Sequence, residues 1–142
     1  MDTSSKSYQI FCDKNDGFSN YIINRSEKSI EKLFDSQSVV YLTPDSDQIL
    51  EEILKSKIYI IGGLVDDSVK KHSSLSFAKT HNIQTAKLPI DKYCQKADQG
   101  SFKQILTINQ VFEILLSKFN GNSWTESFTK SLPQKIGFVP KL

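Results

Sequence analysis

The chain has 142 residues and a formal net charge of +2, and its content of 38% hydrophobic, 24% charged and 11% aromatic residues is typical of a single soluble domain over residues 1–142. No apolar run reaches the roughly 18 residues of a membrane-spanning helix, and the polar first residues show neither a signal peptide nor an arginine-rich transit peptide. Two cysteines make no disulfide framework, so we expect an intracellular protein of the cytoplasm or nucleus, with no support for a mitochondrial one.

The first part of the chain contains short apolar runs between polar segments. The run 8–12 predicts a short strand, and the spacing of apolar residues in 27–34 predicts a short amphipathic helix. The run 38–42 predicts a second strand. It should end before Pro44, because proline cannot donate to a strand ladder.

The next segment is expected to complete a βαβ unit. Asp45 and Gln48 have the spacing of an N-cap and its partner, which predicts a helix over 45–54. The apolar run 58–61 then predicts a strand buried on both faces, as in a parallel sheet. The crossover should be right-handed.

Paired glycines and a lone carboxylate follow this strand. Gly62 and Gly63 permit a sharp turn and a close approach of another backbone or a flat ligand. Asp66 would then lie at the carboxyl end of the strand, where open α/β sheets bind their ligands. The pattern predicts a binding site at this edge.

The second half of the chain continues with alternating elements. Residues 75–80 predict a helix, residues 85–88 predict a strand that Pro89 ends, and residues 91–104 predict a polar, mobile connection.

A longer helix follows, opened by the capping-box pair Thr107 and Gln110. Its apolar stripe is wide, which predicts a deeply packed helix. The stripe contains Ile108, Val111, Phe112, Ile114, Leu115, Leu116 and Phe119.

Ser123 and Glu126 have the spacing to cap a last helix, which carries Trp124 and Phe128. Packing in the core is the favoured role for both aromatic residues, although Trp124 could also stack on a base. The basic tail 133–142 has no periodicity.

Charge is divided unevenly along the chain. Residues 1–66 contain seven basic and eleven acidic residues, a net charge of −4, whereas residues 67–142 contain eleven lysines and five acidic residues, a net charge of +6. A basic half that faces a polyanion would explain the difference, and so would a solvated, lysine-rich surface.

Five segments occur together in the order and spacing of one enzyme family. They are VYLTPDS (40–46), YIIGGLVD (59–66), TAKLPI (85–90), LTINQVFE (106–113) and NSW (122–124). Together they resemble the eukaryotic and archaeal tRNA (guanine-9-N1)-methyltransferases of the SPOUT class, over most of residues 38 to 135.

The resemblance implies an α/β fold with a SPOUT-type parallel sheet and a C-terminal trefoil knot, here over about 38–120. Family members carry a basic N-terminal extension and further strands before the matched part. The expected domain is therefore partial, truncated at the N-terminus. The family is usually taken to be monomeric, and pairing through an exposed sheet edge is the alternative.

The implied function is transfer of a methyl group from S-adenosyl-L-methionine to N1 of guanine at position nine of tRNA. The resemblance implies cofactor contacts by Leu42, Gly63, Asp67, Ser68, Val69, Lys70, Lys71, Leu75, Leu88, Leu106, Thr107 and Ile108. Lys70, Lys71, His72 and Lys79 are candidates for phosphate contacts with the RNA.

Asp66 is the candidate catalytic residue, because guanine N1 carries a proton that must leave. A carboxylate could accept it as a general base, helped if burial raises the pKa of Asp66 above its ordinary value of about 3.9. Alternatively, Asp66 only orients the base and proximity supplies the acceleration. Asp67 could stabilise the sulfonium charge, repel RNA phosphate or lie in solvent.

Other site classes are not supported. The histidines and cysteines lack metal-ligand spacing, so no metal is expected, and the chain contains no nucleophile elbow, Walker loop or dinucleotide fingerprint. Two other functions remain open: a truncated, non-catalytic relative that binds cofactor, RNA or a partner chain, and a nucleotide-binding α/β domain of another superfamily.

Overall fold

The computed structural model describes residues 6–14, 16–17, 20, 22–24, 26–62, 73–98, 106–132 and 137–141. The chain divides into two compact units, Met1–Leu33 and Phe34–Leu142. The expectation of one domain over the whole chain stays a prediction. No helix within the described ranges is long and apolar enough to cross a membrane.

Helices α1 (Lys6–Lys14) and α2 (Ile30–Leu33) lie in the first unit. The strand predicted over 8–12 is wrong, because these residues lie within α1. Periodicity in so short a run does not separate strand from helix, and the described part of this unit offers no strand with which it could pair. The helix predicted over 27–34 is confirmed only as the four residues of α2, none of them buried.

The second unit is built on a parallel three-stranded sheet with the strand order β2-β1-β3. Its strands are β1 (Val39–Leu42), β2 (Ile58–Ile61) and β3 (Gln84–Ala86). A short 3₁₀ helix, η2 (Ser36–Ser38), leads into β1. The α/β class, the parallel sheet and the strand positions are thus confirmed, except that β3 begins and ends earlier than 85–88.

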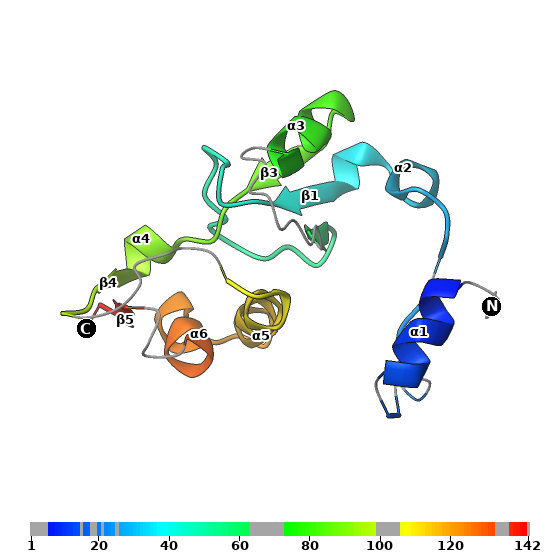
Figure 1. The fold of residues 1–142 in the computed structure, drawn as a ribbon. Helices are drawn as coiled ribbons and strands as arrows, with labels where there is room; N and C mark the ends of the chain where they lie inside the picture. Colours follow the sequence, from blue (N-terminus) through cyan, green and yellow to red (C-terminus); the bar gives the residue numbers. More distant parts are fainter. Residues whose placement is uncertain are drawn as a thin grey trace. The chain divides into compact units, whose positions relative to one another are not determined.

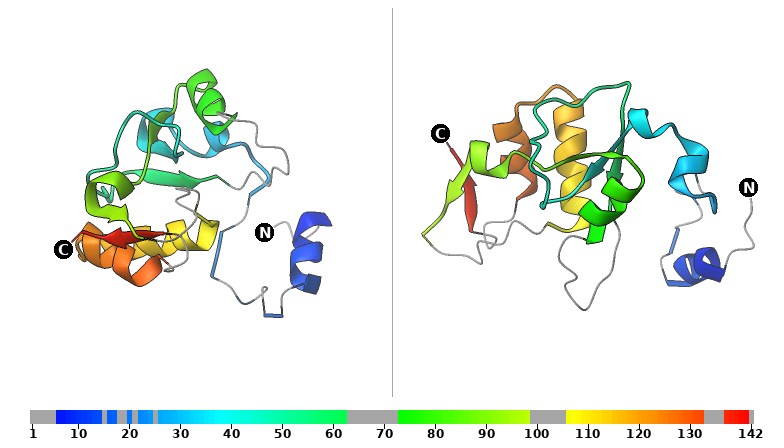
Figure 2. Two further views of the ribbon diagram at one scale, coloured as in Figure 1. Left: turned by 60° about the vertical axis from the view of Figure 1, so that its left-hand side comes forward. Right: turned by 90° about the horizontal axis from the view of Figure 1, so that it is seen from above.

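Helices lie on both sides of this sheet. Figure 1 shows α3 (Ser73–Thr80) on one side and the antiparallel pair α5 (Ile108–Phe119) and α6 (Trp124–Ser131) on the other, and the turned view of Figure 2 agrees. The helix predicted over 75–80 is confirmed as α3. Thr107 with Gln110 and Ser123 with Glu126 form the predicted capping boxes of α5 and α6.

The polar stretch 91–104 is not only a connection. A helical turn, α4 (Ile90–Tyr93), leads into β4 (Cys94–Lys96), which pairs antiparallel with β5 (Phe138–Pro140) from the tail. The prediction missed this ribbon, because three-residue strands carry almost no periodicity and the pairing joins distant segments.

The helix predicted over 45–54 is wrong, since residues 43–57 form turns and one isolated bridge from Ile49 to Lys87. The Thr43 hydroxyl accepts the Asp45 N–H at 3.3 Å, and the Ser46 hydroxyl accepts the Gln48 N–H at 3.1 Å. Such side-chain hydrogen bonds satisfy the backbone in a turn and compete with a helix.

The connection 43–57 is anchored to helices α4, α5 and α6. The indole N–H of Trp124 donates to the Glu51 carbonyl at 2.8 Å, and the Glu51 carboxylate lies 2.6 Å from the Lys92 ammonium. Glu52 and Lys118 form a second ion pair at 3.2 Å. The exposed Glu51–Lys92 pair raises the pKa of Lys92, through the hydrogen bond to Glu51 first.

The core lies between the sheet and the α5–α6 pair. Phe128 and Ile114 are fully buried, and the Trp124 and Phe128 rings stack with centroids 5.8 Å apart. The predicted core role of both aromatic residues is confirmed. The full cluster is Val40, Leu50, Ala86, Ile90, Cys94, Ile114, Leu115, Trp124, Phe128 and Phe138.

Two predictions of deep burial are wrong. All four residues of β2 are only half-buried, because β2 is an edge strand of the described sheet. In α5, Ile114 and Leu115 are buried, whereas Phe112 and Phe119 are exposed. Both elements contain more apolar residues than the neighbouring described elements bury.

Candidate functional site

The three parallel strands end in one row. The strand pairing places Leu42 of β1 opposite Ile61 of β2 on one side and opposite Ala86 of β3 on the other. The segments that begin at Thr43, Gly62 and Lys87 therefore leave the sheet at the same edge. This carboxyl edge is where α/β sheets bind small molecules.

Two half-buried leucines lie at or just beyond this edge, and a third lies just before α5. Leu42 ends β1, Leu88 follows β3 by two residues, and Leu106 precedes α5. Each of the three is half-buried and packs against the core. The structure thus places three of the predicted cofactor-contacting residues on one core, each with part of its apolar surface accessible. Such surface suits the faces of a planar aromatic ring.

Gly62, directly after β2, lies close to the side chain of Tyr41. A Cβ atom at this position would lie 3.0 Å from the hydroxyl oxygen of Tyr41 and 3.4 Å from its Cε1. Tyr41 is buried in β1, and its ring lies 5.9 Å from that of Phe77 on α3. A glycine here lets the end of β2 pack directly on the Tyr41 hydroxyl.

A set of buried hydroxyls fixes the segment after β1. Thr43 and Ser46 are both buried, and the Thr43 N–H donates to the Ala86 carbonyl at 2.9 Å. The Ser46 and Thr85 hydroxyls are hydrogen-bonded at 2.9 Å. None of these residues is among the predicted site residues, although small hydroxyl residues directly after a predicted strand are a usable signal.

Thr107 and Ile108 lie at the start of α5, and both are exposed. The Thr107 N–H donates to Gln110 Oε1 at 2.9 Å, and its hydroxyl donates to Asn109 Oδ1 at 2.6 Å. Thr107 thus has a clear structural role as the N-cap residue.

Two predicted site residues lie on α3. Leu75 is half-buried, and Lys79, a candidate for phosphate contact, is exposed near the end of the helix. The remaining candidates fall outside the described residues. These are Gly63, Asp66, Asp67, Ser68, Val69, Lys70, Lys71 and His72.

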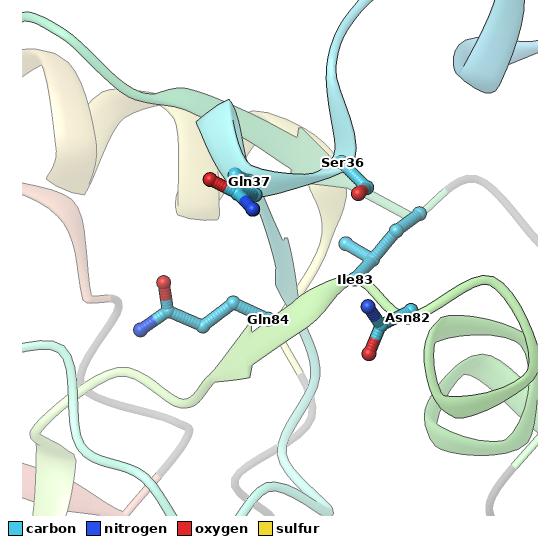
Figure 3. A pocket seen from close by; sticks show the side chains of 5 residues that line it. All are labelled: Ser36, Gln37, Asn82, Ile83 and Gln84. Carbon is cyan, nitrogen blue, oxygen red and sulfur yellow. The ribbon is translucent and has the colours of Figure 1, made fainter.

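A separate pocket of about 370 Å³ lies at the opposite end of the strands. Ser36 and Gln37 precede β1, Asn82 and Ile83 precede β3, and Gln84 is the first residue of β3 (Figure 3). None of these residues was a predicted site residue. The three amides and one hydroxyl offer neutral hydrogen-bonding groups only. Within the described ranges, no group of acidic, histidine and cysteine side chains could hold a metal ion.

Comparison with known proteins identifies the family. The family model of tRNA (guanine(9)-N(1))-methyltransferase TRM10/TRM10A matches residues 2–137. tRNA methyltransferase 10 homolog B of Bos taurus is 42% identical over 139 residues, which are 96% of this chain and 44% of that protein. The tRNA (guanine(9)-N1)-methyltransferase of Schizosaccharomyces pombe is 40% identical over 120 residues, 83% of this chain and 38% of that protein.

Structural comparison agrees. The crystal structure of full-length spTrm10 in complex with SAH superposes with a TM-score of 0.72 and 39% identity, covering 90% of this chain and 67% of that one. The chain spans less than half the length of the curated relatives described above. The family predicted from the five segments is confirmed: the chain belongs to the tRNA (guanine(9)-N(1))-methyltransferase TRM10/TRM10A family.

Proposed function

We propose that this chain binds S-adenosyl-L-methionine at the carboxyl edge of its sheet and serves methyl transfer to N1 of guanine at position nine of tRNA. The observation that carries this proposal is the match of 90% of the chain, at 39% identity, to a Trm10 structure in complex with SAH. SAH is what S-adenosyl-L-methionine becomes after it has given up its methyl group.

The residues at the carboxyl edge fit such a ligand. Leu42, Leu88 and Leu106 offer accessible apolar surface, and the aligned strand ends bring backbone N–H and C=O groups to the same place. This combination of apolar walls and a few polar groups is typical of small-molecule sites. We place the trefoil knot over about 38–120, with Gly63, the stretch 67–71 and residues 106–108 as its walls. Bound there, S-adenosyl-L-methionine supplies a methyl group on a positively charged sulfur.

The proposed role of Asp66 follows from the chemistry of guanine. N1 is protonated at neutral pH, so its lone pair becomes available only as the proton leaves. In the proposal the Asp66 carboxylate accepts this proton while N1 forms its bond to the methyl carbon and the carbon–sulfur bond breaks. General-base assistance of this kind contributes typically about 10²–10⁴-fold to a rate.

Contacts to the tRNA are proposed for Lys70, Lys71, His72 and Lys79. Lys79 is exposed, as a phosphate-binding lysine must be. Contacts to phosphate would position the tRNA without reading its sequence.

The test is a methyl-transfer assay with a tRNA transcript that carries guanine at position nine. We expect N1-methylguanine at that position, and no product from the same transcript with adenine there. Asp66→Asn should lower turnover by about 10²-fold or more while the affinity for S-adenosyl-L-methionine stays nearly unchanged. Asp47→Asn makes the same change at an exposed carboxylate in the connection 43–57 and serves as the control.

The competing function gives a different result. A non-catalytic relative would bind S-adenosyl-L-methionine in a calorimetric titration and yet transfer no methyl group to either transcript. Unchanged turnover in Asp66→Asn would contradict the general-base assignment alone and leave methyl transfer standing.

A further inference from the structure

The pocket at the amino ends of the strands has no role in the proposed methyl transfer. We call it the amino-edge pocket, and its lining residues are Ser36, Gln37, Asn82, Ile83 and Gln84 (Figure 3). Strands β1 and β3 pair in parallel, so both begin at this edge of the sheet. The pocket is separate from the carboxyl edge, because the four residues of β1 between them span about 13 Å at roughly 3.3 Å per residue.

The lining combines an apolar wall with neutral polar groups. Ile83 is buried and contributes apolar surface, whereas Gln37, Asn82 and Gln84 each carry a carboxamide and Ser36 carries a hydroxyl. A carboxamide has an NH₂ donor next to a C=O acceptor, so it pairs with a ligand edge on which an acceptor and a donor are adjacent. The pocket therefore suits a neutral, flat ligand with such an edge.

The backbone of the pocket is fixed by hydrogen bonds from outside it. Lys57 Nζ donates to the Gln37 carbonyl at 2.5 Å, and the Ile83 N–H donates to the Ala78 carbonyl at 2.8 Å. The polar side chains are not used in this way. Within the part of the chain that the structure describes, the hydroxyl and the three carboxamides of the lining have no hydrogen-bond partner in the protein. The walls are thus preformed, and their polar groups are available to a ligand.

We propose that the amino-edge pocket binds a nucleobase, with adenine preferred. The ring face lies against Ile83, and the carboxamides of Gln37 and Gln84 bind its edge. Asparagine and glutamine recognise adenine through N7 and the N6 amino group, to which one carboxamide donates and from which it accepts. The volume of about 370 Å³ is near the small end of the roughly 300–1,000 Å³ of ligand pockets, so one base with its ribose is the expected occupant.

Two other classes of ligand fit less well. A phosphate group needs positive charge or several N–H donors, and no lysine or arginine is among the five lining residues. A sugar offers hydroxyl groups around its ring and little flat apolar surface to place on Ile83. A free nucleoside and an unpaired base of an RNA present the same base edge, and the experiment separates these two sources.

The experiment follows the side-chain NH₂ signals of Gln37, Asn82 and Gln84 by NMR while adenosine, uridine or ribose is added to the 142-residue chain. These signals report on the amino-edge pocket and not on a ligand at the far end of the strands. We expect adenosine to shift all three signals and ribose to leave them unchanged. Uridine should bind at least about tenfold more weakly than adenosine, because it lacks the N6/N7 edge.

Oligonucleotides then identify the source of the base. An oligoadenylate and an oligouridylate of equal length carry the same charge and differ only in the base. If the natural ligand is an unpaired base of an RNA, the oligoadenylate should shift the same signals and bind more tightly than adenosine. If it is a free nucleoside, the oligoadenylate should bind no more tightly than adenosine. Both results support recognition of the base.

A matched pair of variants tests the carboxamide. Gln84→Glu replaces the NH₂ donor with an oxygen and should weaken adenosine binding at least about tenfold. Gln95→Glu makes the same change at an exposed position of β4 and should bind like the unchanged chain. Both substituted side chains are exposed, so the fold is retained, which the Trp124 fluorescence verifies.

Three results would overturn the proposal. They are carboxamide signals that adenosine does not move, equal binding of adenosine and ribose or uridine, and unchanged affinity for adenosine in Gln84→Glu. None of these readouts depends on methyl transfer, so the proposal and the proposed function stand or fall separately.

Discussion

The contact between Gly62 and Tyr41 makes a quantitative prediction at the edge that carries the proposed site. In Gly62→Ala the new Cβ would lie 3.0 Å from the Tyr41 hydroxyl oxygen, which is too close, and Tyr41 is buried and cannot swing into solvent. Overpacking of this kind costs about 1–3 kcal/mol. The φ angle of Gly62 lies outside the left-handed region, so alanine is otherwise tolerated and reduces the entropy of the unfolded chain, a gain of about 0.4–1 kcal/mol. The net expectation is a loss of about 1 kcal/mol.

Without the Tyr41 hydroxyl, Gly62→Ala should no longer lower the free energy of unfolding. In the Tyr41→Phe background the nearest ring atom is Cε1 at 3.4 Å, an ordinary contact, so Gly62→Ala should be neutral or slightly stabilising. The four proteins form a double-mutant cycle with an expected coupling of about 1–2 kcal/mol. Urea unfolding followed by the single, buried Trp124 measures each free energy. An equal loss from Gly62→Ala in both backgrounds would refute the steric explanation.

Three further predictions concern the packing around α6 and β4. Trp124→Phe keeps most of the apolar contact but leaves the Glu51 carbonyl without its 2.8 Å donor, so unfolding should become easier by about 1–3 kcal/mol in urea titrations. Ser123→Ala removes the N-cap acceptor of α6 and should lower the free energy of unfolding by about 1 kcal/mol, whereas Ser123→Asp should retain most of it. Burial raises the pKa of the Cys94 thiol to about 11 from an ordinary 9.0, so the folded chain binds more protons than the unfolded chain between these values. Stability should therefore fall as the pH rises from 9 toward 11, and Cys94→Ala should flatten that slope in urea titrations at several pH values.

The elements that the sequence predicted correctly are those whose signals are local. The α5 and α6 capping boxes each depend on two residues three apart, and both are present in the structure. In α6 the Ser123 N–H donates to Glu126 Oε2 at 2.7 Å, and this hydrogen bond is the first cause of the lowered pKa of Glu126. Likewise Pro44 ends β1 as expected, because a missing N–H depends on no partner.

The helix predicted over 45–54 is wrong because the conformation of this segment depends on distant partners. Asp45 and Gln48 have helix-capping spacing, but Leu50 donates to the Lys87 carbonyl at 2.9 Å, and Lys87 donates to the Gln48 carbonyl at 2.8 Å. These two backbone hydrogen bonds with the distant Lys87, together with the hydrogen bond from Trp124 to Glu51, outweigh a local helical preference. No periodicity in the segment itself contains that information.

The candidate site shows the same difference: some of its residues have a local sequence signal, and others do not. The sequence predicts Leu42 and Leu88 as site residues because each lies at or just after the end of a predicted strand. The parallel register of β1 and β3 then brings both strand ends to one edge of the sheet. The sequence alone does not assign Thr107 to the site, because the same residue is expected both as the N-cap of α5 and as a cofactor contact. The overestimated burial of β2 and α5 is the most informative error. Their apolar patterns predict two covered faces, whereas the described residues cover one, because periodicity records which residues are apolar and not which neighbours are present to bury them.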